Sequence, residues 1–306
     1  MLAIDEQQLS AWIETALTQK KLGTLPTYVP SLAEANPNNF AIVLQSIENP
    51  IISLGNVEKK LPLMSAIKPF LLLYLLCEFG SDFVFQKVGI EPSEKPFNSL
   101  EQLDIDSGWA RNPMINSGAI ALSSLLPGNT SQERCENFCS WLNEYGKCQL
   151  FLDTNILASV RSFPNQNNQA IAQKLVEAGY ISDSKIALDT YNQICCLSGT
   201  IFDLANLGML LVKYPNSEWK KHCCTVKGLM TTCGLYEASS SYAEKIGIPI
   251  KSSVSGIVLG VVPSTGIIAC YSPPLDKQGN SVAGLFLLEL IIRKGRRQEG
   301  ILTSDF

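Results

Sequence analysis

The sequence is poor in histidine, on which many hydrolytic and metal sites depend. Its single histidine, His222, lies in the polar stretch 213–224 (KYPNSEWKKHCC), which is typical of a surface loop or a helix start. A hydrolase made from this chain is therefore expected to work without the usual serine–histidine pair. The adjacent cysteines at 195–196 and 223–224 have no Cys-x-x-Cys companion, so no zinc site is predicted.

Long apolar segments are missing as well. The longest, near 69–77 and 282–292, are too short to span a bilayer, so no membrane partner is expected. Stretch 1–21 has neither the basic start nor the apolar core of a signal peptide. The net charge of −4 argues against nucleic acid as a partner, because phosphate binding requires clustered positive charge. The ten cysteines are then expected to be reduced thiols in the cytoplasm.

What the chain does contain is apolar material for a large core. Apolar residues make up 46% of its 306 positions, which predicts a folded protein rather than a disordered one. Short apolar runs predict two pairs of strands, 39–47 with 50–55 and 256–263 with 266–272. Between 80 and about 230, apolar residues recur mostly at helical spacing.

Strands at both chain ends and helices between them predict the fold class. We expect an α+β fold in which an antiparallel sheet, built from both chain ends and flanked by helices, carries an inserted helical subdomain. The predicted sheet subdomain covers about 1–64 and 230–306, and the helical subdomain about 65–229, within a single catalytic domain. The first helix is expected to end near Gly23 and the last to cover 281–294.

A serine and a lysine stand at the start of the most apolar run in the chain. The run 69–77 predicts a buried helix of about three turns, and Lys68 lies at its mouth. Because burying an unpaired ammonium is costly, this lysine must be neutralised, paired or used in chemistry. Ser65, three residues earlier, shares its helix face. The pair is either a nucleophile with its base or a helix cap beside a satisfied lysine.

The Ser-x-x-Lys motif also marks the nucleophile of penicillin-recognising serine enzymes. Those enzymes carry a Lys-Thr-Gly strand, which is absent here, and the segment KSSVSG (251–256) takes the corresponding place. A penicillin-type hydrolase is therefore disfavoured. Seven segments occur in order along the chain: GTLPTYVP (23–30), SAIKP (65–69), NPMINSGAI (112–120), YNQICCL (191–197), CGLYE (233–237), GIPIKSSVSG (247–256) and SPPLDKQGNS (272–281). Together they resemble the serine-dependent glutaminases, which have the β-lactamase-like fold, from about Leu22 to about Leu288.

The resemblance implies a reaction and a set of roles. Family members convert glutamine and water to glutamate and ammonia, use no cofactor and often form homodimers or homotetramers. Ser65 matches the nucleophile, Lys68 the lysine that activates it, and Tyr236 the tyrosine that carries protons with that lysine. The backbone amides of Ser65 and Val254 match the oxyanion hole. The residues that match those holding the substrate are Tyr28, Asn116, Asn168 and Tyr191.

Chemistry supports these roles, although each residue also has a structural alternative. A serine hydroxyl needs a base, and Lys68, with an ordinary pKa of about 10.4, serves as one only if desolvation lowers that value. Ser65 and Asn116 are alternatively helix caps. Tyr28 and Tyr191 are alternatively core residues whose hydroxyls have hydrogen-bond partners.

The chain departs from the family where the substrate's amino group binds. Family members carry a glutamate, seven residues before the asparagine matched by Asn168, that pairs with the α-ammonium of the substrate. An ungapped alignment places Arg161 there, and a shift of one residue places Val160 there and moves the asparagine to Asn167. No acidic residue occurs between Asp153 and Glu177. Losing a charge-assisted contact of this kind typically costs about 1.5–3 kcal/mol.

Other departures lie beside the predicted nucleophile and oxyanion hole. Met64 stands where the family usually has glutamine, and Ser253 and Ile257 stand where it often has glycines. Three hypotheses follow: a glutaminase, an amidase or acyltransferase of the same fold with another substrate, or a non-catalytic partner. An acid that reaches the pocket from elsewhere would favour glutamine, and Arg161 pointing into the pocket would favour another substrate.

Overall fold

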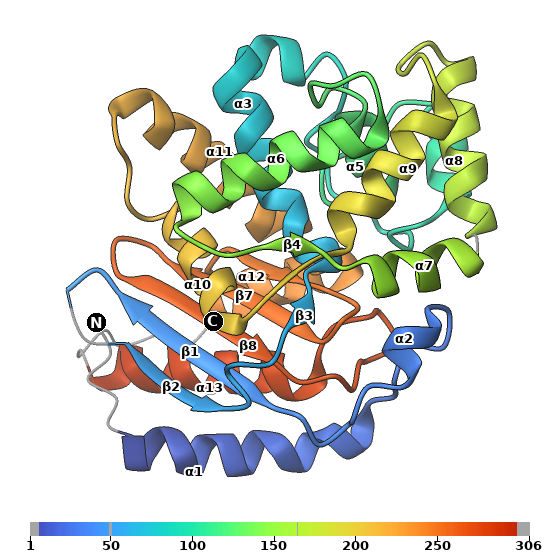
Figure 1. Cartoon of the computed structure of the whole chain (residues 1–306). Coiled ribbons are helices and arrows are strands. Elements are labelled where there is room, and N and C mark those ends of the chain that lie inside the picture. Colours follow the sequence, from blue (N-terminus) through green and yellow to red (C-terminus); the bar gives the residue numbers. More distant parts are fainter. Residues whose placement is uncertain (1–5, 49–50, 164, 299–306) are drawn as a thin grey trace.

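The computed structural model describes residues 6–48, 51–163 and 165–298, and its centre is a five-stranded antiparallel sheet (Figure 1). The strand order is β2-β1-β8-β7-β6. The strands are β1 (Ala41–Ser46), β2 (Ile52–Gly55), β6 (Ile250–Ser252), β7 (Ile257–Val262) and β8 (Gly266–Tyr271). Val43 pairs with Ala269, so strands from the two chain ends lie side by side. The predicted sheet built from both ends is confirmed, and residues 49–50, at the junction of its first two predicted strands, lie outside the described residues.

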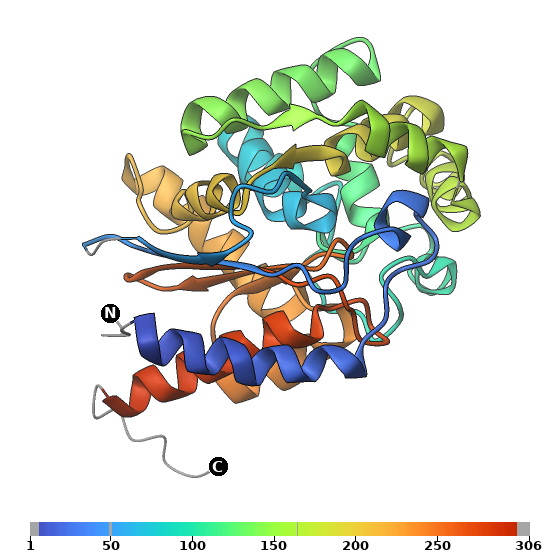
Figure 2. The same cartoon turned by 60° about the horizontal axis from the view of Figure 1, so that its bottom comes forward.

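The central strands β1, β7 and β8 are buried on both faces because they are apolar at most positions, whereas the edge strand β2 is only partly buried. In β1, Ile42 and Leu44 join a core cluster with the first and last helices. Val43, between them, joins the cluster formed with the helical layer. This alternation follows from the period of two along a strand, and it produces three layers. Figure 2 shows α1 (Glu6–Leu17) and α13 (Val282–Gln298) side by side under the sheet.

The other face of the sheet carries the helical layer (Figure 1). Its helices are α3 (Lys68–Val84), α4 (Leu100–Ile105), α5 (Asn116–Ser123), α6 (Ser131–Gly146), α7 (Thr154–Ser162), α8 (Gln166–Glu177), α9 (Ser184–Cys195), α10 (Ile201–Met209) and α11 (Ser217–Cys233). Shorter helical elements are η1 (Thr18–Leu22), α2 (Pro30–Ala33), η2 (Met64–Ile67), η3 (Tyr236–Ala238) and α12 (Ser239–Ile246). The buried helix after Ser65 is longer than predicted and breaks at Gly80, whose φ is 76°. No helix in the described part of the chain is long and apolar enough to cross a membrane.

One feature of the middle region differs from prediction, and another decides between two alternatives. A small sheet of β3 (Leu61–Pro62), β5 (Leu197–Gly199) and β4 (Phe151–Leu152) lies within it, and strands this short have no detectable periodicity. Of the two alternatives for the stretch around His222, a loop or a helix start, the structure has the helix: His222 lies in the second turn of α11, and its side chain is partly exposed. The polar run around it is the solvent-facing side of an amphipathic helix.

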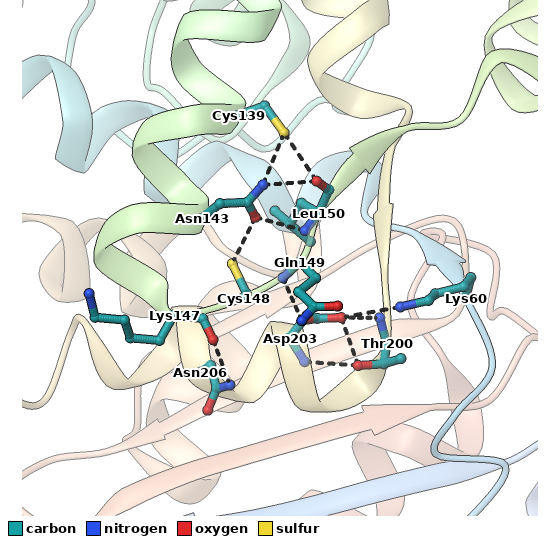
Figure 3. Close-up of polar contacts among 10 residues, drawn as sticks. All are labelled: Lys60, Cys139, Asn143, Lys147, Cys148, Gln149, Leu150, Thr200, Asp203 and Asn206. Atoms are coloured by element: carbon teal, nitrogen blue, oxygen red, sulfur yellow. Dashed lines mark hydrogen bonds and ion pairs between the residues drawn. The ribbon is translucent and has the colours of Figure 1, made fainter.

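A polar network ties the end of α6 to the start of α10 (Figure 3). The Asn143 side chain accepts from Leu150 N at 2.7 Å and donates to Leu150 O at 2.9 Å. Asp203 accepts from Gln149 N at 2.9 Å and from both the backbone and the hydroxyl of Thr200, which caps α10. These bonds hold the connection between α6 and β4 in one conformation.

Candidate active site

Ser65 lies in η2, the short helical turn between β3 and α3, and only 5% of it is exposed. Its predecessor, Met64, has a left-handed backbone with φ of 46°, which is uncommon for a non-glycine residue. The N-cap of α3 is Ile67, and no side chain caps that helix. The capping alternative for Ser65 is therefore wrong, because the turn carries the serine ahead of the cap position.

Lys68 begins α3 and is completely buried. Its Nζ donates to Met114 O at 3.1 Å and to Asn116 Oδ1 at 2.8 Å. Burial lowers the pKa of Lys68 to about 8, although the nearby Cys195 thiol acts in the opposite direction. A substantial fraction of this lysine is therefore neutral near pH 8, as a general base requires.

Asn116 connects the predicted site residues to one another. Its Oδ1 accepts from Lys68 and from the Tyr191 hydroxyl, at 2.8 and 3.0 Å, and its Nδ2 donates to Asn168 Oδ1 at 2.9 Å. It is the first residue of α5 rather than its cap, and its side chain makes no capping bond. Asn168 is buried whereas Asn167 is exposed, so the geometry agrees with the ungapped alignment.

Tyr236 approaches Ser65 from η3, and its backbone is also left-handed, with φ of 58°. Burial raises the pKa of its phenol to about 12, and the hydroxyls of Ser65 and Ser252 lie near enough to oppose that effect. Even so, the Tyr236 hydroxyl meets hydrogen-bond geometry with no group in the described residues. The ring packs against Phe97, with centroids 4.7 Å apart. A buried hydroxyl beside the predicted nucleophile, without a partner among the described residues, is available to carry a proton.

Lys251 is a site residue that the sequence analysis missed. It is completely buried on β6, and its Nζ donates to Gly234 O and Ser252 O at 2.9 and 2.7 Å. The same Nζ lies 4.4 Å from the centroid of the Tyr236 ring. Desolvation, followed by the charge of Lys68, lowers the pKa of Lys251 well below its ordinary value. The signal was its place in KSSVSG, where related enzymes carry the lysine of Lys-Thr-Gly.

Gly234, at the end of α11, allows that end of the helix to lie close to strand β6. A Cβ on Gly234 would lie 1.8 Å from the carbonyl oxygen of Ile250, so any side chain would push η3 away from β6. Tyr236 follows two residues later and therefore depends on this close contact.

Val254 lies in the turn between β6 and β7, and its amide donates to no acceptor within the part of the chain that the structure describes. The preceding Ser253 is buried, and its Oγ donates to Leu63 O at 2.9 Å. This bond links the turn of Val254 to the segment that leads into Ser65. The extra side chain at 253 thus points to the protein backbone.

These segments surround a cavity of about 350 Å³. Seven predicted residues line it: Tyr28, Ser65, Asn116, Arg161, Asn168, Tyr191 and Val254. Lys68 and Tyr236 do not line it; Lys68 bonds to the lining residue Asn116, and the hydroxyl of Tyr236 lies near that of Ser65. Tyr28 is partly exposed at 43%, and burial of its phenol raises its pKa. Met64 and Val160 also contribute to the lining.

Arg161 lines the cavity from α7, and an acid that the sequence analysis did not consider meets it there. Asp189, on α9, accepts from Arg161 Nε at 3.0 Å and from Nη2 at 2.7 and 2.9 Å. Asp189 is 28 residues away from Arg161 in the sequence and reaches it from α9. The positive charge of Arg161 is therefore paired inside the protein.

Comparison with known proteins agrees with this geometry. The glutaminase family model matches residues 23–298. A Synechocystis sp. glutaminase is 46% identical over 94% of this chain and 89% of its own length. An Oceanobacillus iheyensis glutaminase is 35% identical over 92% of this chain and 90% of its own.

Solved structures are similar over the same extent. The Bacillus subtilis glutaminase YbgJ, in its covalent complex with 5-oxo-L-norleucine, has a TM-score of 0.84 and 26% identity, covering 95% of this chain and 98% of its own. A Bacillus glutaminase solved in 4.3 M NaCl has a TM-score of 0.85 and 27% identity, covering 94% and 97%. This chain therefore belongs to the glutaminase family of hydrolases, which has the β-lactamase-like fold and converts L-glutamine and water to L-glutamate and ammonia.

Proposed function

We propose that the protein hydrolyses L-glutamine through an acyl-enzyme on Ser65, with Lys68 and Tyr236 moving the protons. The observation that carries the proposal is the fully buried Lys68, whose pKa burial lowers to about 8. A neutral lysine amine has two N–H bonds, and Lys68 donates two hydrogen bonds, to Met114 and Asn116. Its lone pair remains to accept the proton of Ser65.

The steps follow from these positions. Ser65 Oγ gives its proton to Lys68, directly or through Tyr236, and attacks the side-chain carboxamide carbon of glutamine. The amides of Ser65 and Val254 stabilise the oxyanion. The proton returns to the leaving nitrogen, ammonia departs, and an ester to Ser65 remains. Water then attacks the ester by the same proton route and releases glutamate.

The substrate is held by the polar groups of the cavity. We assign its carboxamide and amino-acid head to Tyr28, Asn116, Asn168 and Tyr191, which line the cavity together. The hydrogen bonds from Asn116 to Tyr191 and Asn168 keep three of these groups in fixed relation. Arg161 is the observation that favours the second candidate, an amidase of the same fold with a different head-group preference.

The first test is release of glutamate and ammonia from L-glutamine by the wild type and by Ser65→Ala. Removing the nucleophile is expected to lower kcat by about 10⁴-fold or more. Ser123→Ala is the matched control, because Ser123 is also buried, on α5, and among the described residues its hydroxyl bonds only to Ala119 O. Mass spectrometry after reaction with 6-diazo-5-oxo-L-norleucine should place the adduct on the peptide containing Ser65. Turnover by Ser65→Ala near that of the control would refute the assignment.

Two further expectations stay predictions. We propose a homodimer or homotetramer, which light scattering on the purified protein tests directly. We also propose the cytoplasm as the place of the reaction, and fractionation of cells that express the full chain tests it.

A further inference from the structure

The charged groups that line the active-site cavity differ in how many hydrogen bonds they already make within the protein. Among the described residues that line it, Arg161, Lys185 and Asp189 carry formal charge, which gives a net charge of +1. The remaining polar lining consists of neutral amides, hydroxyls and a thiol. Which of the three charges can still receive a substrate depends on the hydrogen bonds each already makes.

Asp189 has no capacity left. Its Oδ1 accepts two bonds from Arg161, and its Oδ2 accepts from Arg161 at 2.9 Å, Ser131 Oγ at 2.5 Å and Gln193 Nε2 at 2.9 Å. A carboxylate offers about four lone-pair positions, so these contacts saturate it. Burial raises the pKa of Asp189, but the bonds from Ser131, Arg161 and Gln193 outweigh burial and keep it below the ordinary value. The ionised group is thus committed to the protein, and a substrate ammonium would find no free carboxylate.

Arg161 has capacity to spare. Its Nε and Nη2 bond to Asp189, and its Nη1 donates to no group in the described residues. The side chain is 49% exposed, so this end of the guanidinium is accessible. Because the ion pair fixes the guanidinium plane, Nη1 is held in place at little entropic cost. Lys185, which is also exposed at the cavity, has no ion pair in the described part of the chain.

We propose that Arg161 selects the α-carboxylate of the substrate, and that the cavity does not require a free α-ammonium. The substrate class is then side-chain carboxamides bearing an α-carboxylate, N-acylated glutamine included. This inference rests on the proposed function and names its head-group specificity. Phe163 lines the cavity and is 65% exposed, so it offers an apolar surface for an acyl group.

The test is binding to the Ser65→Ala protein, measured by calorimetry, with three probes: L-glutamine, N-acetyl-L-glutamine and L-glutamine α-amide. N-acetyl-L-glutamine should bind within about fivefold of L-glutamine, and the α-amide at least about tenfold more weakly, because it lacks the charge-assisted contact. In a protein that also carries Arg161→Gln, the preference for L-glutamine over the α-amide should fall to about threefold or less. The freed Asp189 should at the same time make N-acetyl-L-glutamine bind more weakly than L-glutamine.

Arg111→Gln in the same background is the matched control. Arg111 bonds to Asp106 through Nε and Nη2, as Arg161 does to Asp189, but it does not line the cavity. Arg111→Gln should leave the ratios of the affinities for the three probes unchanged. The inference is overturned if N-acetyl-L-glutamine binds more than about a hundredfold more weakly than L-glutamine, if Arg161→Gln leaves the ratios unchanged, or if no probe binds. Turnover by Ser65→Ala would instead refute the nucleophile, and it leaves these ratios interpretable.

Discussion

Two polar regions of this molecule differ in how completely their groups are satisfied. In the network of Figure 3, the side chains of Asn143 and Asp203 bond to backbone groups of the segment after α6. Around Ser65, by contrast, the Tyr236 hydroxyl and the Val254 amide have no partner among the described residues. The first region holds two helices together, whereas the second keeps donors free for a ligand. Buried polarity alone therefore does not distinguish structure from function. A missing partner alone does not either, because buried side-chain atoms without a partner among the described residues also occur in Ser31, Asn39, Gln45, Glu237 and Ser272. What sets the Ser65 region apart is that its free groups lie together at the cavity.

The backbone shows the same contrast. Lys147, in the network, has φ of 51°, but it follows α6 at the position where helices commonly end in a left-handed residue. Met64 and Tyr236, with φ of 46° and 58°, follow no helix end of this kind and flank the reacting groups. Strain of this type costs about 1–3 kcal/mol and persists where surrounding contacts enforce it. In the described part of the chain, Ser107 and Ser264 also have positive φ, but they lie in turns and do not line the cavity. Met64 directly precedes the predicted nucleophile, and Tyr236 is the predicted proton carrier.

The largest expected effect is a fall in kcat after a substitution in the region around Ser65. Tyr236→Phe removes a hydroxyl that carries protons, so kcat should fall by about 10²–10⁴-fold. The free energy of unfolding should stay the same or rise by up to about 1 kcal/mol, because a buried hydroxyl without a partner is lost. Steady-state kinetics and urea unfolding measure the two quantities.

Tyr271→Phe is the control for this change. Tyr271 is equally buried on β8, Asn39 lies near its hydroxyl, and it does not line the cavity. Loss of this hydroxyl should change stability by no more than about 1 kcal/mol and leave kcat unchanged. If Tyr236→Phe behaved in this way instead, the hydroxyl would have a structural role only.

In the network of Figure 3, a substitution should instead lower stability and leave kcat unchanged. Asp203→Asn turns a carboxylate oxygen into an N–H₂ donor that faces the donors of Thr200 or Gln149. Leaving such buried donors unpaired should cost about 2–4 kcal/mol of stability, with kcat unchanged. Asp183→Asn, at the exposed N-cap of α9, should cost only a few tenths of a kcal/mol, because asparagine caps equally well. A fall in kcat for Asp203→Asn would contradict the separation.

Local sequence patterns predicted the parts of the fold that depend on long apolar runs. The strands at both ends and the helix after Lys68 follow from their period and composition. The small sheet of β3, β4 and β5 was not predicted, because strands of two or three residues are too short to show a periodic pattern. The end of α3 escaped because the residues after 77 are polar enough to resemble a loop, although Phe83 and Val84 continue the helix.

The site was predictable where one segment supplies both members of a pair. Ser65 and Lys68 are three residues apart, and the chemistry of an isolated buried lysine was visible in the sequence. The partners of Arg161 and Tyr236 were not, because Asp189 and Lys251 reach them from other elements. The charge balance in a cavity depends on residues that come together only in the folded protein. Interpreting Arg161 without Asp189 therefore overstated the change of charge at the position of the family's glutamate.

A smaller effect concerns pH. If neutral Lys68 is the base, kcat/KM should rise about tenfold per pH unit below its pKa of about 8 and level off above it. The sign follows because burial lowers the pKa, so raising the pH converts the inactive ammonium into the active amine. Rates from about pH 6 to about pH 9 test this, with kcat/KM for Tyr271→Phe following the same curve. A profile that falls with pH would exclude Lys68 as the base.

The smallest effect compares the same substitution in both regions. Cys139, in the network, contacts Asn143 Nδ2 at 3.7 Å and Leu150 O at 3.4 Å, and thiols are weak partners. Cys139→Ala should therefore cost about 1 kcal/mol or less and leave kcat/KM unchanged, since Asn143 keeps its bonds to Leu150.

Cys195→Ala removes a buried thiol that lines the cavity and lies close to Lys68 and Tyr191. It should cost a similar amount of stability but lower kcat/KM by about threefold to tenfold, because Tyr191 loses one of the contacts that orient it. Thermal unfolding and steady-state kinetics on both variants measure this difference. Equal kinetic effects would mean that the free groups around Ser65 tolerate displacement as well as the satisfied network does.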